Sequence, residues 1–281
     1  MLIKIDDCQL LITCCNQEGG LYFADFKNGE HTLQKVLNVE CRGIAKYQGS
    51  FVVASTNAIL VLNEQFDVIQ TKKLTERLDL HGVAVYGDCA YVVETKRNSI
   101  GIYDLQNNLN KVDEIKFSPK DEDVFHMNDL FIYGDTLYLS MFSYSTTNFS
   151  LFKFPKDLRT HGVIVEYSLA NRKVMSIVHR KLFQPHSIKL YKGHLYYCVS
   201  AKFQVQKDEE TIFNGLGYTR GLDIKDNLLF IGQSESRHID RLLSQHSNIL
   251  LDCGIYVHNT STKISSFIHI PSKEIYQILL L

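Results

Sequence analysis

The sequence has no large excess of charge of either sign. It contains 30 lysines and arginines against 31 aspartates and glutamates, a formal net charge of −1. A general binder of nucleic acid needs a strong basic excess or a basic stripe to neutralise phosphates. The charge balance therefore excludes a general polyanion binder and predicts no nucleic-acid partner.

Long apolar segments and a leader sequence are also missing. No uncharged apolar run approaches the roughly 18 residues that a membrane-spanning helix needs. The chain begins Met1-Leu-Ile-Lys-Ile-Asp-Asp and runs straight into a strand pattern, without the basic region and long apolar stretch of a signal peptide. We therefore expect a soluble protein of the cytoplasm with no membrane span.

Paired cysteine motifs and the common nucleotide and hydrolase motifs are absent. The seven cysteines are scattered, lie mostly in apolar runs and include no Cys-x-x-Cys pair, which indicates buried free thiols in a reducing compartment. No Gly-x-Gly-x-x-Gly follows a strand, and no Walker loop, Gly-x-Ser-x-Gly or His-Glu-x-x-His occurs. These absences disfavour nucleotide-dependent chemistry and the common serine hydrolase arrangement.

Tryptophan is missing too, but 15 tyrosines and 16 phenylalanines are present. Together with Val and Ile they form short apolar runs separated by Gly, Asp and Asn, a pattern typical of half-buried strands. Long amphipathic helical patterns are scarce. All-β folds of this length are often one domain, so we predict a single all-β domain over residues 1–281.

An internal repeat runs through the chain. Five segments share a polar lead residue, a small residue or Asp, a strand, a two-residue turn and a second strand; their lead residues are Arg42, His81, Asn128, His186 and Arg220. Each segment reads as a β-hairpin with a tight polar turn. A strand-only repeat of roughly 40 residues is the signature of propeller blades.

The repeat predicts a β-propeller with six blades. The blades are expected at about 1–38, 39–77, 78–121, 122–181, 182–215 and 216–272, and the weak outer strands of the fifth leave the count open by one. The segment Glu274-Ile-Tyr-Gln-Ile-Leu-Leu-Leu281 reads as a strand that returns to the first blade. Such pairing of the chain ends closes the propeller and removes an open sheet edge.

Two segments depart from the repeat. Residues 143–161 form a polar, insertion-like stretch, and residues 234–252 contain the only plausible short helix. Loops on a rigid scaffold often carry function. Harmless insertions explain both segments equally well.

The lead position of the repeat is the main candidate for function. The first strand of each propeller blade lines the central channel, so the five lead residues would lie near one mouth of it. A wet channel needs polar lining, which is one explanation; a ligand site is the other. Because Arg offers a forked donor set to carboxylate or phosphate, we predict that Arg42, His81, Asn128 and Arg220 bind an anionic substrate.

Histidines near this position suggest catalysis or metal binding. His126 lies two residues before Asn128 and is expected to share its face of the strand. His126 and His186, with His81, would supply the three imidazoles of a catalytic zinc or iron site; calcium is a further divalent candidate. In one alternative His126 and His186 act as acid and base without a metal. In the other they are ordinary hydrogen-bonded histidines with no role in chemistry.

Three more residues complete the candidate site. Glu94 ends a strand and is the best-placed carboxylate for general-base catalysis, with an ordinary exposed glutamate as the alternative. Arg237 closes another strand and either reaches over the channel mouth to the substrate or pairs with Glu235 in solvent. Asp129 stands where other repeats carry Gly or Ser, and we expect it to brace a neighbouring histidine.

Three segments also resemble a known family. His126-Met-Asn-Asp-Leu130, Gln184-Pro-His-Ser-Ile188, and Gly217-Tyr-Thr-Arg-Gly-Leu222 with Phe230-Ile-Gly-Gln-Ser-Glu-Ser-Arg237 are similar to strings in uncharacterised bacterial proteins of the DUF4915 and TIGR03032 type. The resemblance covers residues 120–240 well and the N-terminal third loosely. It implies a bacterial propeller without an assigned activity. The sequence departs from the family at Asp129, where Gly is expected, and in the Ser-rich loop 143–148.

These observations favour a small-molecule enzyme with its site at the central channel. It would act on an anionic metabolite or sugar derivative by hydrolysis, elimination or isomerisation, as a hydrolase, lyase or isomerase, with a divalent metal or by acid–base chemistry alone. The alternative is a non-catalytic propeller that binds a ligand or serves as a protein-interaction scaffold.

Overall fold

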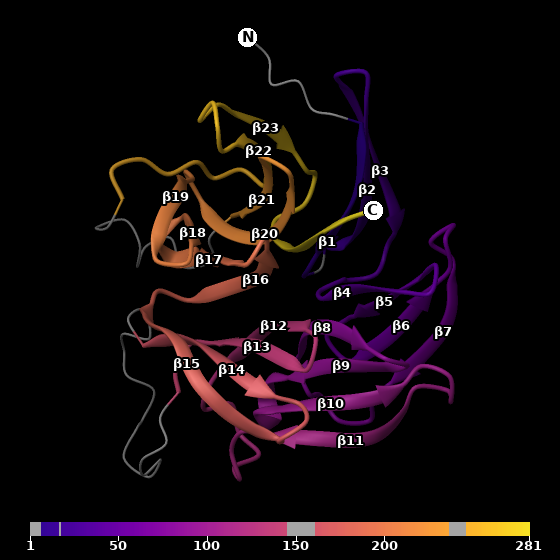
Figure 1. Cartoon of the computed structure of the whole chain (residues 1–281). Helices are drawn as coiled ribbons and strands as arrows, with labels where there is room; N and C mark the ends of the chain where they lie inside the picture. Colours follow the sequence, from indigo (N-terminus) through magenta and orange to yellow (C-terminus); the bar gives the residue numbers. More distant parts are fainter. Residues whose placement is uncertain (1–6, 17, 145–160, 236–245) are drawn as a thin grey trace. The chain divides into compact units, whose positions relative to one another are not determined.

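The computed structural model describes residues 7–16, 18–144, 161–235 and 246–281 of the chain (Figure 1). Two compact units are present: unit 1 comprises Met1–Arg42 and Lys189–Leu281, and unit 2 comprises Gly43–Ile188. Nearly all regular structure in the described residues is strand, with two short 3-10 turns, η1 (Thr95–Arg97) and η4 (Ser200–Lys202). None of the helical segments in this part of the chain is long and apolar enough to cross a membrane.

The strands form six four-stranded antiparallel sheets, which confirms the all-β class and the six-bladed β-propeller. In five sheets the strands are neighbours in chain order, so the first two strands of each form a hairpin. The blade expected at 182–215 has two outer strands after all, so the open question of the blade count is resolved at six. Most of each predicted insertion lies outside the described residues, and Arg237 lies there too.

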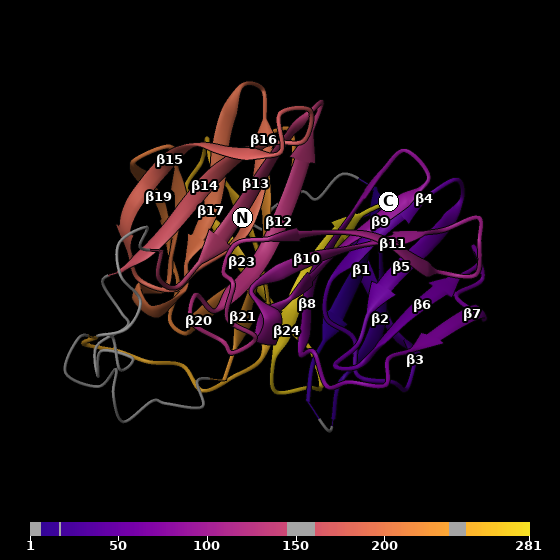
Figure 2. The same ribbon diagram turned by 90° about the horizontal axis from the view of Figure 1, so that it is seen from below.

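Unit 2 contains three of the sheets, whose strands follow one another in order (Figures 1 and 2). They are β4 (Ile44–Tyr47), β5 (Ser50–Ala54), β6 (Ala58–Leu62) and β7 (Val68–Lys73); β8 (Leu80–Tyr86), β9 (Cys89–Glu94), β10 (Ser99–Asp104) and β11 (Asn110–Lys116); and β12 (Met127–Tyr133), β13 (Thr136–Met141), β14 (Gly162–Ser168) and β15 (Lys173–Leu182). Their apolar side chains form continuous clusters, because inner strands are buried on both faces.

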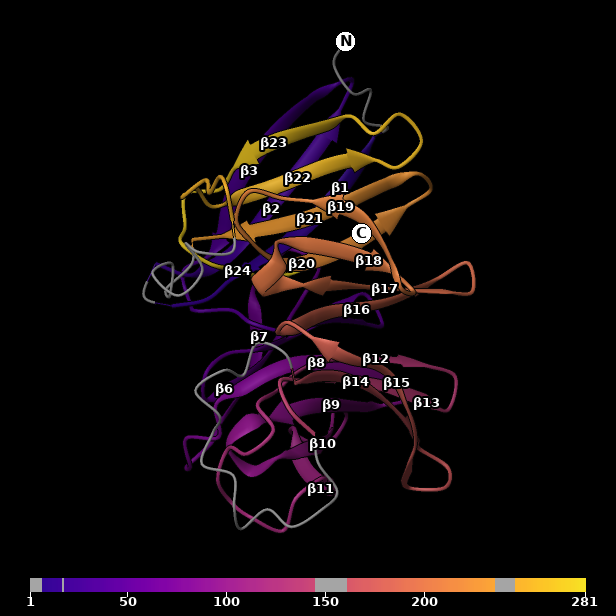
Figure 3. The same cartoon turned by 90° about the vertical axis from the view of Figure 1, so that its left-hand side faces the viewer.

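The other three sheets belong mainly to unit 1 (Figure 3). They are β1 (Cys8–Cys14), β2 (Gly20–Lys27) and β3 (Glu30–Leu37) with β24 (Ile275–Leu280); β16 (Pro185–Tyr191), β17 (His194–Val199), β18 (Gln204–Lys207) and β19 (Glu210–Asn214); and β20 (Tyr218–Lys225), β21 (Leu228–Ser234), β22 (Gly254–Asn259) and β23 (Ser265–His269). Strand β16 begins in unit 2 and continues past Ile188 into unit 1.

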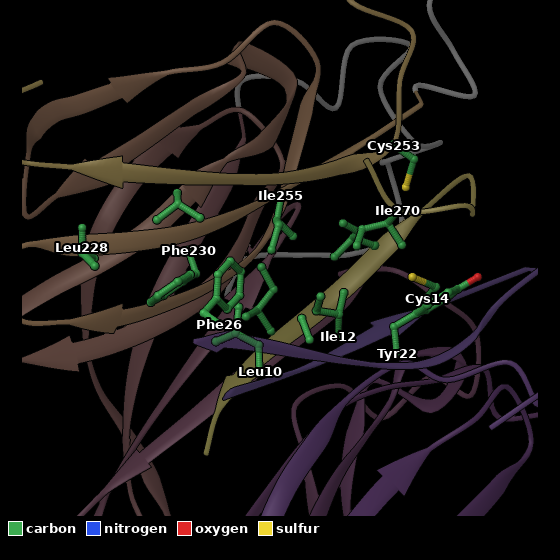
Figure 4. Close-up of a cluster of buried hydrophobic side chains, with 14 residues drawn as sticks. Leu10, Ile12, Cys14, Tyr22, Phe26, Leu228, Phe230, Cys253, Ile255 and Ile270 are labelled. Carbon is green, nitrogen blue, oxygen red and sulfur yellow. The ribbon is translucent and has the colours of Figure 1, made fainter. Parts of the chain in front are cut away.

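The C-terminal strand closes the first sheet, as predicted. β24 pairs antiparallel with β1, with Ile278 opposite Ile12. Apolar side chains of β1, β2, β21, β22 and β24 meet in one buried cluster, in which the rings of Phe26 and Phe230 lie 6.2 Å apart (Figure 4). The end of the chain is therefore part of the core of unit 1 and not an appendage.

The inner hairpins have the predicted two-residue turns. β4 and β5 are joined by Gln48 and Gly49, at φ 46° and 78°, and β16 and β17 by Lys192 and Gly193, at φ 50° and 79°. Two consecutive positive φ angles define a type I′ turn, whose twist matches that of the flanking strands. Local chemistry thus sets the register of these hairpins.

His258 on β22 is a buried titratable group in unit 1. Its side chain is 5% exposed, Nδ1 lies 2.8 Å from Ser265 Oγ, and Nε2 has no hydrogen-bond partner among the described residues. Burial and then the charge of Lys263 lower the pKa of His258 below its usual value of 6.5. The unfolded chain therefore takes up this proton more readily than the folded one.

This lowered pKa predicts an acid-sensitive stability. The contribution of neutral His258 is fully present above pH 6.5 and is lost as the pH falls through the folded-state pKa. We expect the melting temperature to fall between pH 7.5 and pH 5 by more in the wild type than in His258→Gln, measured at constant ionic strength. The exposed His194→Gln is the control and should keep the wild-type slope; equal slopes for all three proteins would contradict the prediction.

Candidate functional site

The lead residues of the repeat lie in local distortions of their strands. The pairing between first and second strand shifts register between Leu80 and Val83 in β8, and between Met127 and Leu130 in β12. β20 has the same shift between Thr219 and Leu222. These β-bulges take His81, Asn128 and Arg220 out of the regular ladder. Bulges that re-aim a side chain are common beside functional sites.

A left-handed residue precedes three of the lead residues by two positions. Asp79, His126 and Gln184 have φ angles of 55°, 47° and 54°. At this turn the polar lead side chain contacts the carbonyl oxygen of the left-handed residue: His81 Nδ1 to Asp79 O at 2.9 Å, and His186 Nδ1 to Gln184 O at 3.0 Å. Asn128 Nδ2 donates to His126 O at 2.8 Å in the same way. At these three positions the sequence repeat therefore corresponds to the same local turn, with the lead side chain bound to the carbonyl oxygen two residues before it.

Unit 2 brings three histidines and one phenylalanine into contact. The ring of His126 lies 5.7 Å from that of His81 and 4.6 Å from that of Phe142, between centroids. Phe142, directly after β13, also contacts the ring of His186 at 5.3 Å. His81 and His186 are buried, whereas the His126 side chain is 31% exposed. Of the three, His126 is the histidine that a dissolved molecule reaches most readily.

Hydrogen bonds assign the tautomers of these histidines. Thr95 Oγ1 donates to Met127 O at 2.7 Å, so it accepts from His81 Nδ1 at 2.8 Å. His186 Nδ1 also faces a carbonyl oxygen, which only accepts. In both neutral rings the proton is therefore on Nδ1 and the lone pair on Nε2. This arrangement is the usual one for histidines that act as bases or ligands through Nε2.

His126 is paired with a carboxylate. Asp123 Oδ2 accepts from the ring Nδ1 at 2.6 Å, and Asp123 Oδ1 accepts from the backbone N–H of His126 at 2.8 Å. One aspartate thus fixes both the ring and the strained left-handed backbone of the same residue. Two other His–Asp pairs, at His194 and His269, have the same Nδ1 contact at 2.7 Å but are more exposed and make no contact with another histidine that the structure records.

Asp129 connects two strands in the interior of unit 2. Its Oδ2 accepts from the backbone N–H of Ser187 at 2.9 Å, and its backbone N–H donates to Ser140 Oγ at 3.1 Å. Ser187 follows His186 on β16, so Asp129 holds the backbone next to that histidine. This contact is the kind of support that the predicted bracing of a neighbouring histidine requires, acting here on the backbone beside His186.

The described residues do not fit a three-histidine metal centre. Zn–N bonds are about 2.0–2.1 Å, so three ligating nitrogens must converge on one point. No group of three His, Cys, Asp or Glu side chains in the described part of the chain is arranged to hold a metal ion. Phe142 contacts both His126 and His186. Metal binding by His81, His126 and His186 stays a prediction.

Glu94 is buried and not exposed. Its carboxylate accepts from Ser99 Oγ at 2.9 Å, Tyr103 Oη at 2.7 Å and Lys111 Nζ at 2.9 Å, which joins β9, β10 and β11. Burial and the adjacent Glu94 charge raise the pKa of Tyr103, which keeps the phenol protonated as a donor. The alternative of an ordinary exposed glutamate is wrong, and this geometry favours a structural carboxylate over the predicted general base.

The predicted anion-binding arginines lie in unit 1. Arg42, just before β4, is half-buried and its Nε donates to Glu40 Oε1 at 3.1 Å. Arg220 on β20 is 8% exposed, and its guanidinium carbon lies 3.7 Å from the centre of the Tyr276 ring. Arg42 is thus paired with a carboxylate, whereas the recorded contact of the Arg220 guanidinium is with an aromatic ring.

Four residues of these surroundings were not expected from the sequence: Thr95, Asp123, Phe142 and Tyr276. The spacing of Asp123 and His126, three residues apart before a strand, was the one available signal for a His–Asp pair. The contacts of Thr95, Phe142 and Tyr276 come from segments far apart in the chain. No local pattern marks them.

Solved structures with a similar fold extend over most of the chain. A chain of the crystal structure of a nidogen/laminin complex has a TM-score of 0.68 at 9% identity and covers 97% of each chain. A protein of unknown function from Bacteroides caccae has a TM-score of 0.68 at 10% identity, over 98% of this chain and 99% of that one. A luciferin-regenerating enzyme has a TM-score of 0.57 at 11% identity, over 84% and 78%. At such identities the likeness shows the fold alone.

Sequence comparison gives a family but no activity. No curated protein matches the chain. The model of the family described as "Domain of unknown function (DUF4915)" matches residues 2–281. The match confirms the resemblance seen in three segments and extends it over the N-terminal third. The chain belongs to the DUF4915 family.

Proposed function

We propose that the protein is a small-molecule enzyme that uses His126, oriented by Asp123, as its acid–base group. The observation that carries the proposal is the two-point contact of Asp123 with the ring and the backbone N–H of a partly exposed histidine. Backbone strain of about 1–3 kcal/mol persists where the surroundings fix it and is typical of functional sites. The left-handed backbone of His126 meets this description.

The geometry supports proton transfer at Nε2 of His126. With Nδ1–H donated to Asp123, the neutral ring has its lone pair on Nε2, which can take a proton from a bound substrate. The aspartate then stabilises the imidazolium, as in the carboxylate–histidine pairs of hydrolases. The rings of His81 and Phe142 pack against His126 and limit its rotation.

Proton transfer of this kind suits hydrolysis, elimination or isomerisation. His81, Asn128 and His186 would orient the substrate, a small anionic metabolite or sugar derivative. Glu94, Arg42 and Arg220 have no role in this proton transfer. Cytoplasmic location, bacterial origin and a single-domain organisation stay predictions.

The test is an activity screen with matched histidine variants. Wild-type protein, His126→Gln, Asp123→Asn and the control His194→Gln are incubated with a panel of lactones, sugar acids and hydroxy acids, with conversion followed by proton NMR. General acid–base groups contribute about 10²–10⁴-fold, so His126→Gln should lose conversion by that factor. Asp123→Asn should lose about tenfold or more, and the exposed pair variant His194→Gln should equal the wild type.

Thermal unfolding of each variant separates loss of activity from loss of fold. Conversion by His126→Gln at the wild-type rate would overturn the role of this histidine. Conversion of no compound by the wild type would contradict the proposal and favour the non-catalytic binding or scaffold propeller. Equal losses in His126→Gln and His194→Gln would show a general effect of removing a His–Asp pair.

A further inference from the structure

Unit 1 contains a buried cation without a bound anion. Arg220 on β20 is 8% exposed, and among the described residues its guanidinium makes no ion pair or hydrogen bond that the structure records. Its Nε is buried with no hydrogen-bond partner. Burying a charge without a partner costs several kcal/mol, so such a group is rare in a folded protein unless something binds it.

The surroundings hold Arg220 in one place. The guanidinium stacks on Tyr276 of β24, with its carbon 3.7 Å from the ring centre. A side chain on the neighbouring Gly232 would collide with the backbone carbonyl of Arg220 and approach Ile275 Cγ2 to 2.6 Å. Gly221, at φ 86°, allows the chain to turn directly after the arginine. Both glycines thus fix the backbone at Arg220, and the ring of Tyr276 packs against the guanidinium.

The nearest acidic groups are otherwise occupied. Glu274 accepts from Cys15 Sγ at 3.2 Å, and it acts on Arg220 only through its charge. Burial raises the pKa of Cys15 to about 12, so this thiol stays protonated and adds no anion. The buried Nε–H of Arg220 therefore has no anionic acceptor among the described residues.

We propose that Arg220 is the binding group of a site for a small carboxylate anion, with Tyr276 as its stacking platform. A guanidinium forks to the two oxygens of one carboxylate, and one carboxylate neutralises one arginine. A phosphate dianion would leave negative charge next to Glu274, which is 5% exposed. Anion binding at Arg220 does not depend on the chemistry proposed at His126.

The proposal predicts that Arg220→Met is more stable than the wild type without anion and no longer responds to carboxylate. Removing an unpaired buried charge relieves its desolvation cost, and Met keeps much of the volume. Thermal unfolding is measured in a carboxylate-free buffer and across an acetate titration, with NaCl holding ionic strength constant. A ligand that binds only the folded state at tenfold over its Kd should raise the wild-type melting temperature by about 2 °C.

The controls separate this site from others. Arg42→Met removes an arginine whose Nε is bound to Glu40, and it should retain the acetate response. His126→Gln should also retain it, whatever the outcome of the activity screen. A lower melting temperature of Arg220→Met without anion would show a structural arginine. An equal acetate response in wild type and Arg220→Met, no wild-type response, or a larger response to inorganic phosphate than to acetate would overturn the proposal.

Discussion

Deletion of residues 274–281 should leave a chain that no longer unfolds in one cooperative transition. The deleted segment contains β24, which pairs with β1 along its length. Ile275 and Ile278 are fully buried in the core cluster of unit 1, and Tyr276 is 1% exposed. Full burial of one such side chain stabilises by about 1.5–3 kcal/mol. Three of them, with the ladder hydrogen bonds, approach the 5–15 kcal/mol that stabilises a whole protein.

The deletion also exposes the edge of β1, a strand with five buried residues. An unpaired apolar edge strand is a template for aggregation, so size-exclusion chromatography should show soluble aggregates or no monomer. Circular dichroism should show no melting transition above 25 °C. The control removes Leu281 alone, whose backbone N–H donates to Gln9 O, and it should melt within a few degrees of the wild type. A similarly small change in the longer deletion would show that β24 is dispensable.

The strand repeat and the closure could be predicted because their causes are local in the sequence. Two-residue turns such as Gln48-Gly49 and Lys192-Gly193 need positive φ angles, which Gly adopts at low cost, and they set the register of each hairpin. The apolar run of the last eight residues has no partner nearby in the sequence. Its return to β1 follows from the need to pair an edge strand.

Most of the site could not be predicted, because bulges and tertiary contacts decide it. Simple alternation would place His81 and Val83 on the same face, but the bulge between Leu80 and Val83 breaks that rule. The stack of Arg220 on Tyr276 joins strands far apart in the chain. Glu94 ends an apolar strand like many exposed residues, and only the positions of β10 and β11 reveal that it is buried.

Glu94→Ala should destabilise the protein by up to about 3–5 kcal/mol, the cost of removing one partner of a fully buried ion pair; here the carboxylate is fully buried and the Lys111 side chain is 30% exposed. The substitution removes one acceptor of the Ser99 hydroxyl, which also hydrogen-bonds Glu114, and the recorded acceptor of the Tyr103 hydroxyl. An unsatisfied buried polar group costs about 1–3 kcal/mol. A Cβ on Gly101 would approach Tyr103 Cε2 to 2.7 Å, so the surroundings are too tight for easy rearrangement. Urea unfolding of wild type and variant gives the free energy of unfolding directly.

A substitution of Lys111 tests whether Glu94 has a structural or a catalytic role. Lys111→Met removes the only cation bound to the Glu94 carboxylate among the described residues. It should lower the free energy of unfolding about as much as Glu94→Ala does, because it leaves the charge of Glu94 buried and uncompensated. Glu114, whose side chain is 25% exposed, also contacts Lys111 at 3.4 Å; Glu114→Gln is the matched control and should cost at most about 1 kcal/mol. The double variant Glu94→Gln/Lys111→Met should recover part of the loss, since both charges are gone. Wild-type stability in Glu94→Ala would contradict the structural role, and the carboxylate would again be a candidate general base.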